Sequence, residues 1–205
     1  MSTFIFDIDG TLIDSVPAYL KGLQQTMRRH GREYALEELT FSNGIPSTAT
    51  AAHLGFSGAD AQALIAEWIE DSKPFTAQVD WIAGMPATLA ALHQAGHKLG
   101  IVTSKSAAEF ALDDTKYHFT DYVDTRIVAH DAPHNKPAAD PLLLALERLH
   151  GQPQDAIYVG DTQVDSQAAH NANIRFALAT WTSQPTAALE PIAYALKKPE
   201  DLLPL

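Results

Sequence analysis

Two aspartates stand one residue apart at the end of a hydrophobic run in FIFDIDGTLIDS, residues 4–15. Side chains alternate along an extended strand, so Asp7 and Asp9 are predicted to lie on the same side of it. Two carboxylates this close repel each other, and the pKa of one rises unless a cation lies between them. The pair therefore indicates a divalent metal site, with one carboxylate left to act as a nucleophile beside a general acid and base.

Further polar side chains end or follow other hydrophobic runs. Thr103 and Ser104 end LGIVTS, Asp161 ends AIYVGD with Asp165 four residues on, and Lys136 precedes the helical pattern DPLLLALERL. Ligands of open α/β sheets bind beyond the carboxyl ends of the strands, so we expect these groups at one edge.

These residue types suit a metal and a phosphoryl ligand together. Oxygen ligands favour Mg²⁺, which commonly binds one or two carboxylates plus a substrate phosphate, and Asp161 supplies an additional carboxylate. Thr103 offers a hydroxyl, and the backbone after it offers N–H groups at a predicted helix N-terminus, where anions are favoured. Lys136 is a compact positive charge for the phosphate and the nucleophile, and Gly10 allows close backbone approach.

The elements that position these residues alternate along the chain. Short β-rich runs occupy residues 4–9, 99–104, 122–129, 156–161 and 174–180, and helical patterns occupy 85–94, 107–113, 140–149 and 163–170. Near-continuous apolar runs are typical of strands covered on both faces. Alternating strands and helices predict an α/β fold with a Rossmann-like parallel sheet of right-handed βαβ units.

Residues 16–80 contain helical patterns and no strand-like run. Amphipathic or helix-favouring segments cover 16–31, 47–55 and 58–72. The pattern predicts a small helical cap domain at 16–80, inserted after the first strand into a core domain made of 1–15 and 81–205.

The composition restricts the classes of partner. The 205 residues carry a net charge of −11 and contain no cysteine. This balance argues against a nucleic-acid surface, which needs clustered lysine and arginine. No apolar run reaches the length of a membrane span, and the N-terminus has no basic region before an apolar core. We expect a cytoplasmic protein acting on a small phosphorylated metabolite, with no nucleic-acid or membrane partner; the oligomeric state is left open.

Four stretches, taken together, resemble the motifs of the haloacid dehalogenase superfamily of phosphatases. They are DIDGT at 7–11, IVTSK at 101–105, NKPAADP at 135–141 and YVGDTQVDSQAA at 158–169, in the order and spacing of that family. The resemblance covers residues 1–15 and about 80–180. The helical insert stands where the family has its helical cap.

The resemblance implies Mg²⁺-dependent hydrolysis of phosphate esters through an aspartyl-phosphate. Asp7 would attack phosphorus, and Asp9 would protonate the leaving group and then activate water. The other implied roles are phosphoryl binding by Thr103, Ser104 and Lys136, metal binding by Asp7, the Asp9 carbonyl and Asp161, and supporting roles for Gly10, Thr11 and Asp165, the last ordering a metal-bound water or Lys136.

Within the family, GIP at 44–46 and VTSK at 102–105 most resemble the phosphoglycolate phosphatase-like subgroup. Phosphoglycolate is thus one substrate to consider. The alternatives are a phosphosugar mutase similar to β-phosphoglucomutase, against which the cap segment GIPSTATAAHLGF counts because it contains no lysine or arginine, and a non-catalytic binding module that kept the fold.

Several residues also have plain structural interpretations. Asp161 would serve as a helix N-cap, Asp165 as a solvated first-turn acid, and Lys105 as a loop lysine. Asn173 suits a left-handed turn after a helix. Thr182 follows Trp181 where relatives have glycine, which we interpret as a change in a peripheral loop.

Overall fold

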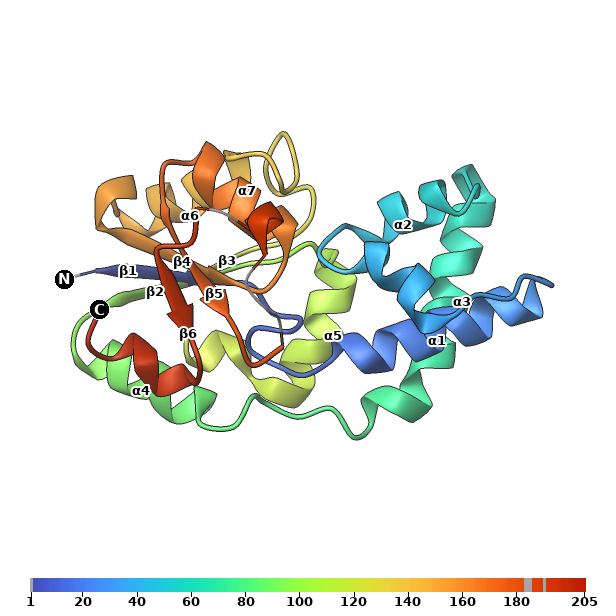
Figure 1. The fold of residues 1–205 in the computed structure, drawn as a ribbon, viewed down its shortest axis with the longest axis horizontal. Coiled ribbons are helices and arrows are strands. Elements are labelled where there is room, and N and C mark those ends of the chain that lie inside the picture. Colours follow the sequence, from blue (N-terminus) through green and yellow to red (C-terminus); the bar gives the residue numbers. More distant parts are fainter. Residues whose placement is uncertain (1, 183–185, 190) are drawn as a thin grey trace.

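A six-stranded parallel sheet forms the centre of the molecule (Figure 1). The computed structural model describes residues 2–182, 186–189 and 191–205. The strand order in this part of the chain is β3-β2-β1-β4-β5-β6. The strands are β1 (Thr3–Phe6), β2 (Lys98–Val102), β3 (Thr125–Ile127), β4 (Ala156–Gly160), β5 (Arg175–Ala179) and β6 (Tyr194–Leu196). The predicted fold class is confirmed.

Helices cover both faces of this sheet, which is why the central strands β1 and β4 are buried at every position. Phe4 and Phe6 of β1 pack in one hydrophobic cluster with residues of α4 (Met85–Gln94) and α5 (Ala107–Tyr117). Ile5, between them, packs in a second cluster with α6 (Asp140–Leu149) and α7 (Gln163–Asn171). Successive side chains of β1 thus pack against the helices on opposite faces of the sheet. β1 lies in the middle of the sheet, with its carboxyl end between β2 and β4.

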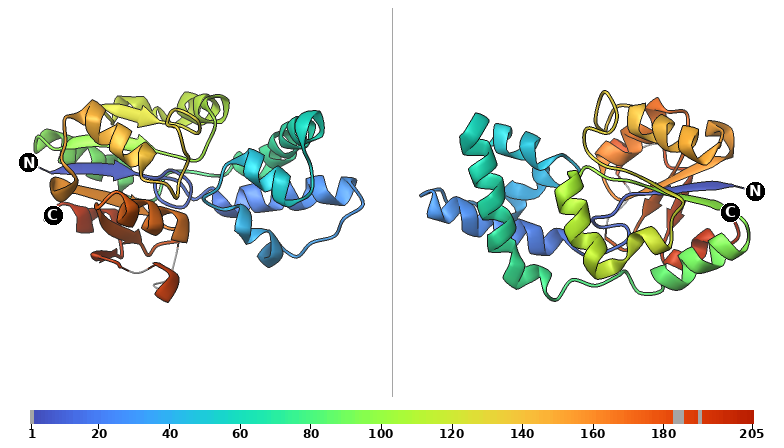
Figure 2. Two further views of the ribbon diagram at one scale, coloured as in Figure 1. Left: turned by 90° about the horizontal axis from the view of Figure 1, so that it is seen from above. Right: turned by 180° about the vertical axis from the view of Figure 1, so that it is seen from behind.

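A helical insert, defined here as Val16–Thr76, lies to one side of the sheet (Figures 1 and 2). It consists of α1 (Val16–Arg29), the 3₁₀ turn η1 (Leu36–Ser42), α2 (Ser47–His53) and α3 (Gly58–Thr76). It has its own buried cluster, which includes Leu23, Met27 and Leu64. This cluster holds the helices of the insert together, and side chains of the insert form one wall of the pocket at the sheet edge. The domain limits at 16–80 stay a prediction.

Short 3₁₀ turns complete the connections in the described residues. They are η2 (Phe119–Asp121), η3 (Pro153–Asp155), η4 (Ala187–Leu189) and η5 (Pro199–Leu202). No helix among the described residues is long and apolar enough to span a membrane.

Three details differ from the predictions. β1 ends at Phe6, and although the Asp7 N–H still bonds the Val159 carbonyl at 2.9 Å, the chain turns at Gly10, where φ is +76°. The predicted strand at 122–129 is reduced to β3. The edge strand β6 was not predicted, because three residues give too little periodicity. The left-handed conformation of Asn173 is confirmed, with φ of 55°.

A close approach between α1 and α3 yields a test of the packing of the insert. A Cβ atom on Gly22 of α1 would lie 1.9 Å from Oγ and 2.8 Å from Cα of Ser72 in α3. Gly22→Val must therefore push the two helices apart, and we expect it to destabilise the protein by about 1–3 kcal/mol in urea unfolding. The neighbouring exposed variant Lys21→Ala is the control, and equal stability of both variants would contradict this packing.

Candidate active site

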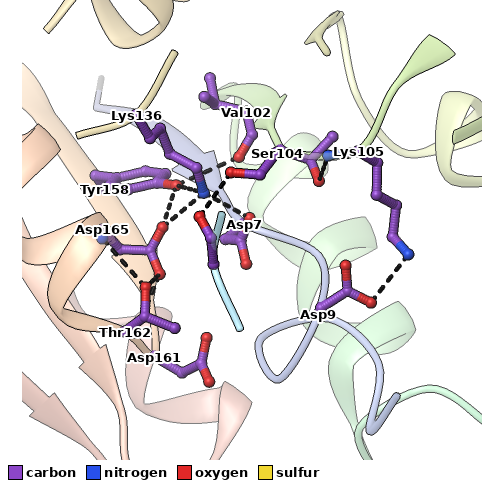
Figure 3. Close-up of polar contacts among 12 residues, drawn as sticks. Asp7, Asp9, Val102, Ser104, Lys105, Lys136, Tyr158, Asp161, Thr162 and Asp165 are labelled. Atoms are coloured by element: carbon purple, nitrogen blue, oxygen red, sulfur yellow. Dashed lines mark hydrogen bonds and ion pairs between the residues drawn. The ribbon is translucent and has the colours of Figure 1, made fainter. Parts of the chain in front are cut away.

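The ammonium group of Lys136 lies between two buried carboxylates at the carboxyl end of the sheet (Figure 3). Its Nζ is 2.8 Å from Oδ1 of Asp7 and 2.7 Å from Oδ1 of Asp165. It also lies 3.0 Å from the hydroxyl of Tyr158, which donates to Asp165 at 2.8 Å. All three ammonium protons have a partner, so the lysine fixes the orientation of Asp7.

Burial controls the protonation of this cluster. Burial, with the nearby charges of Asp165 and Asp9, raises the pKa of Asp7 to about 7 against the opposing effect of Lys136. Burial also acts to raise the pKa of Asp165, but Lys136 and the hydroxyls of Thr162 and Tyr158 hold it below the ordinary value. Burial would lower the pKa of Lys136, yet the two carboxylates raise it above its usual range. Lys136 alone therefore does not keep Asp7 fully ionised.

The carboxylates fit a hard divalent cation. Oxygen atoms of Asp7, Asp161 and Asp165, all three buried, lie within 4.8 Å of one another. Burial, followed by the charges of Asp165 and Asp7, raises the pKa of Asp161 well above its ordinary value. A Cβ atom at Gly10 would lie 2.4 Å from Oδ2 of Asp161, so glycine is needed for this approach. A second positive charge at Asp7 and Asp161 would favour ionisation of both.

This arrangement changes the starting argument about Asp7 and Asp9. The carboxylate of Asp7 is directed toward Lys136, whereas that of Asp9 is directed toward Lys105 (Figure 3). The carboxylate of Asp165 does more than that of Asp9 to raise the pKa of Asp7. The expected metal contact of Asp9 through its backbone carbonyl stays a prediction.

Asp165 is buried and not a solvated acid, so its plain interpretation is wrong. Its Oδ2 accepts from the backbone N–H and the hydroxyl of Thr162, at 3.1 and 2.5 Å, and the Thr162 hydroxyl accepts from the N–H of Asp165. This capping box makes Thr162, and not Asp161, the N-cap of α7. The helix start thus locks the carboxylate that orients Lys136.

A second lysine, Lys105, is buried on the other side of Asp9. Its Nζ lies 3.1 Å from Oδ1 of Asp9 and 2.9 Å from Oδ2 of Asp113, and 3.2 Å from the hydroxyl of Tyr19. The Ser15 hydroxyl also donates to Asp9. Burial would lower the pKa of Lys105, but Asp9, Tyr19 and Asp113 raise it well above its usual value. Lys105 therefore lies in a loop, between β2 and α5, as expected, but it is buried and ion-paired rather than solvated.

Thr103 and Ser104 lie where β2 ends. Thr103 is buried, and its Oγ1 accepts from the N–H of Lys105 at 3.2 Å. The Ser104 hydroxyl donates to the carbonyl of Gly44, at 2.7 Å, in the helical insert. Asn43 of the same loop donates to Asp161 at 3.4 Å. The insert therefore closes over the site through the loop that precedes α2.

The turn after Asp9 is held from the far end of the chain. The Trp181 indole donates to the carbonyl of Thr11 at 3.2 Å, and the Thr182 hydroxyl donates to the carbonyl of Gly10. Thr11 itself is fully buried. The loop at residues 181–182 thus supports the site, and its interpretation as peripheral is wrong.

The residues of the site that escaped the sequence prediction include Tyr19, Asn43, Asp113 and Tyr158. Tyr158 carried a usable signal, because a tyrosine in the middle of a fully buried strand needs a hydrogen-bond partner for its hydroxyl. The other three come from the insert and from α5, where no local pattern distinguishes them from surface polar residues.

Comparison with known proteins defines the class of this fold and site. Residues 4–179 match the profile of the haloacid dehalogenase-like hydrolases, and the chain belongs to this family. The predicted family and the predicted class of enzyme, a hydrolase, are confirmed.

Individual relatives cover the chain nearly end to end. It is 28% identical to pyrophosphatase PpaX of Bacillus mycoides, over the whole chain and 96% of the relative. It is similar in structure to a candidate phosphoglycolate phosphatase of Lactobacillus plantarum, with a TM-score of 0.86 and 30% identity over 99% and 98% of the two chains. A candidate β-phosphoglucomutase of Thermotoga maritima shares the fold, with a TM-score of 0.76 and 24% identity over 100% and 97%.

Removal of the central lysine tests the electrostatics of the cluster. Lys136→Met leaves Asp7 and Asp165 buried without their cation, so we expect a loss of about 3–5 kcal/mol in the free energy of unfolding. Lys73→Met, which removes an exposed pair with Glu70, should cost less than about 1 kcal/mol. Urea unfolding checks both variants, and equal effects would contradict the role given to Lys136.

Metal binding is tested on the folded protein. Mg²⁺ at about 100 times its dissociation constant should stabilise the protein by about 2.7 kcal/mol, read as a rise in Tm. Asp161→Asn should abolish this rise, and the exposed variant Asp155→Asn should retain it. A rise that persists unchanged in Asp161→Asn would place the metal elsewhere.

Proposed function

We propose that this protein is a Mg²⁺-dependent phosphatase of small phosphate monoesters that works through an aspartyl-phosphate. The observation that carries the proposal is one buried nucleophile candidate, Asp7, oriented by Lys136 and placed beside Asp161. Asp9 and Thr103 line the same pocket between the sheet edge and the insert. Family membership supports the class of reaction.

In the proposed first step, a carboxylate oxygen of Asp7 forms a bond to phosphorus as the bond from phosphorus to the ester oxygen breaks. Asp9 gives a proton to the departing oxygen. In the second step, Asp9 takes a proton from water, the water oxygen bonds to phosphorus, and the bond to Asp7 breaks. Phosphate leaves and Asp7 is regenerated, so the chemistry needs no other reactant.

The remaining residues position the reactants. Thr103 and the backbone at Ser104 would hold the phosphoryl oxygens. Lys136 would join them by exchanging one of its present contacts for a phosphoryl oxygen, while Asp165 keeps it in place. Asp7, the Asp9 carbonyl and Asp161 would hold Mg²⁺, which supplies charge neutralisation for the phosphoryl group. The insert would exclude water while the aspartyl-phosphate forms.

Pyrophosphate and phosphoglycolate enter as candidate substrates because relatives carry these names. A mutase must hold a second phosphate group of its substrate. Among the described residues that line the pocket, the only lysine or arginine is Lys105, which is already paired. This favours hydrolysis over transfer. We further propose a cytoplasmic location and a small phosphorylated metabolite as the partner.

Phosphate release from a panel of small esters with Mg²⁺ tests the proposal. Asp7→Asn should lower kcat by at least about 1,000-fold, because no nucleophile remains. Asp9→Asn should lower it by about 100- to 10,000-fold. EDTA should abolish turnover, and the exposed variant Asp14→Asn should keep full activity. Turnover that survives in Asp7→Asn would contradict the aspartyl-phosphate route.

A further inference from the structure

The part of the pocket beyond Asp9 has a mostly apolar wall. The insert contributes Leu20, Ile45, Trp68 and Ile69, and α5 contributes Leu112 from the core. Leu112 is 61% exposed, which is unusual for a large hydrophobic side chain. A leaving group that projects from the phosphoryl site past Asp9 would meet these side chains.

Positive charge on this side of the pocket is already neutralised. Lys105 contacts Asp9 and Asp113 at 3.1 and 2.9 Å, and its ammonium lies over the Tyr19 ring, 4.3 Å from the centroid. Glu109 adds a further acid to the lining. An anionic leaving group would therefore face the carboxylates of Asp9, Asp113 and Glu109. The one lysine beside them, Lys105, already forms ion pairs with Asp9 and Asp113.

Three polar groups that line the pocket are also used internally. The Trp68 indole N–H donates to the carbonyl of Tyr19 at 2.9 Å, and the Ser42 hydroxyl donates to the carbonyl of Leu39 at 2.8 Å. The Ser104 hydroxyl donates to the carbonyl of Gly44. A strongly hydrated leaving group would thus lose its water without gaining these donors.

We infer that the enzyme selects phosphate monoesters of uncharged, mainly apolar alcohols, and that Leu112 and the paired Lys105 exclude leaving groups with a second anionic group. The inference rests on the proposed phosphatase function and specifies its substrate class. It predicts that this enzyme disfavours the anionic substrates that the names of its relatives suggest. The reason is that the apolar wall offers no free cation among the described residues.

An isosteric pair of esters tests the selection. Isobutyl phosphate and phosphoglycolate have the same number and arrangement of heavy atoms, with two methyl groups in place of the carboxylate oxygens. We expect kcat/KM to be about 100-fold higher for isobutyl phosphate, since a site rejects a group whose partners are missing. Equal or faster hydrolysis of phosphoglycolate would overturn the inference.

A charge introduced at the wall should shift this ratio. Leu112→Arg adds a positive charge at an exposed position of the wall and should reduce the preference for isobutyl phosphate by about tenfold or more. Leu143→Arg is the matched control, because Leu143 is also exposed, at 45%, but lies on α6 and does not line the pocket. An unchanged ratio in Leu112→Arg would argue against a leaving group at this wall.

Binding separates failure of the inference from failure of the proposed function. Calorimetry with Mg²⁺ compares 3-methylbutylphosphonate with 3-phosphonopropionate, in which a methylene replaces the ester oxygen. Tighter binding of the alkyl compound, by about tenfold or more, supports the selection even if no ester is hydrolysed. Tighter binding of 3-phosphonopropionate overturns it, and absent turnover contradicts the phosphatase alone.

Discussion

The site depends on the burial of carboxylates that need positive charge. Asp7, Asp161 and Asp165 are gathered beyond the ends of β1 and β4, where burial leaves them little contact with water. Lys136 neutralises one pair, and its orientation depends on the capping box that fixes Asp165 at the start of α7. The proposed Mg²⁺ would neutralise the remaining negative charge. The position and orientation of Asp7 thus depend on the sheet, on the N-terminus of α7 and on Lys136.

The two buried lysines pair with different aspartates. Lys136 contacts Asp7, the proposed nucleophile, whereas Lys105 contacts Asp9, the proposed general acid and base. Lys105 links the core to the insert, because Asp113 belongs to α5 and Tyr19 belongs to α1. Any movement of the insert that takes Tyr19 away changes the surroundings of Asp9. In the proposed mechanism, closure of the insert and proton transfer by Asp9 would be coupled through this contact.

The sequence allowed the phosphoryl side to be predicted because its residues follow strong strand patterns. Asp7, Thr103 and Asp161 each come directly after a buried run, and parallel strands bring such positions together. Lys105 also follows one of these runs, but its burial and pairing could not be predicted, since they depend on Asp113 and on Tyr19 from another part of the fold. Thr182 was misjudged for the same reason, because its contact with Gly10 spans most of the chain.

Chemical trapping of the phosphorylated enzyme tests the central claim most directly. Rapid quenching during turnover, followed by borohydride reduction and mass spectrometry, converts an aspartyl-phosphate to homoserine at the residue that carried it. The account predicts homoserine at position 7 in the wild-type enzyme, and none at Asp9, Asp161 or Asp165. Continued turnover without modification at position 7, or modification at another aspartate, would contradict the assignment of Asp7 as the nucleophile.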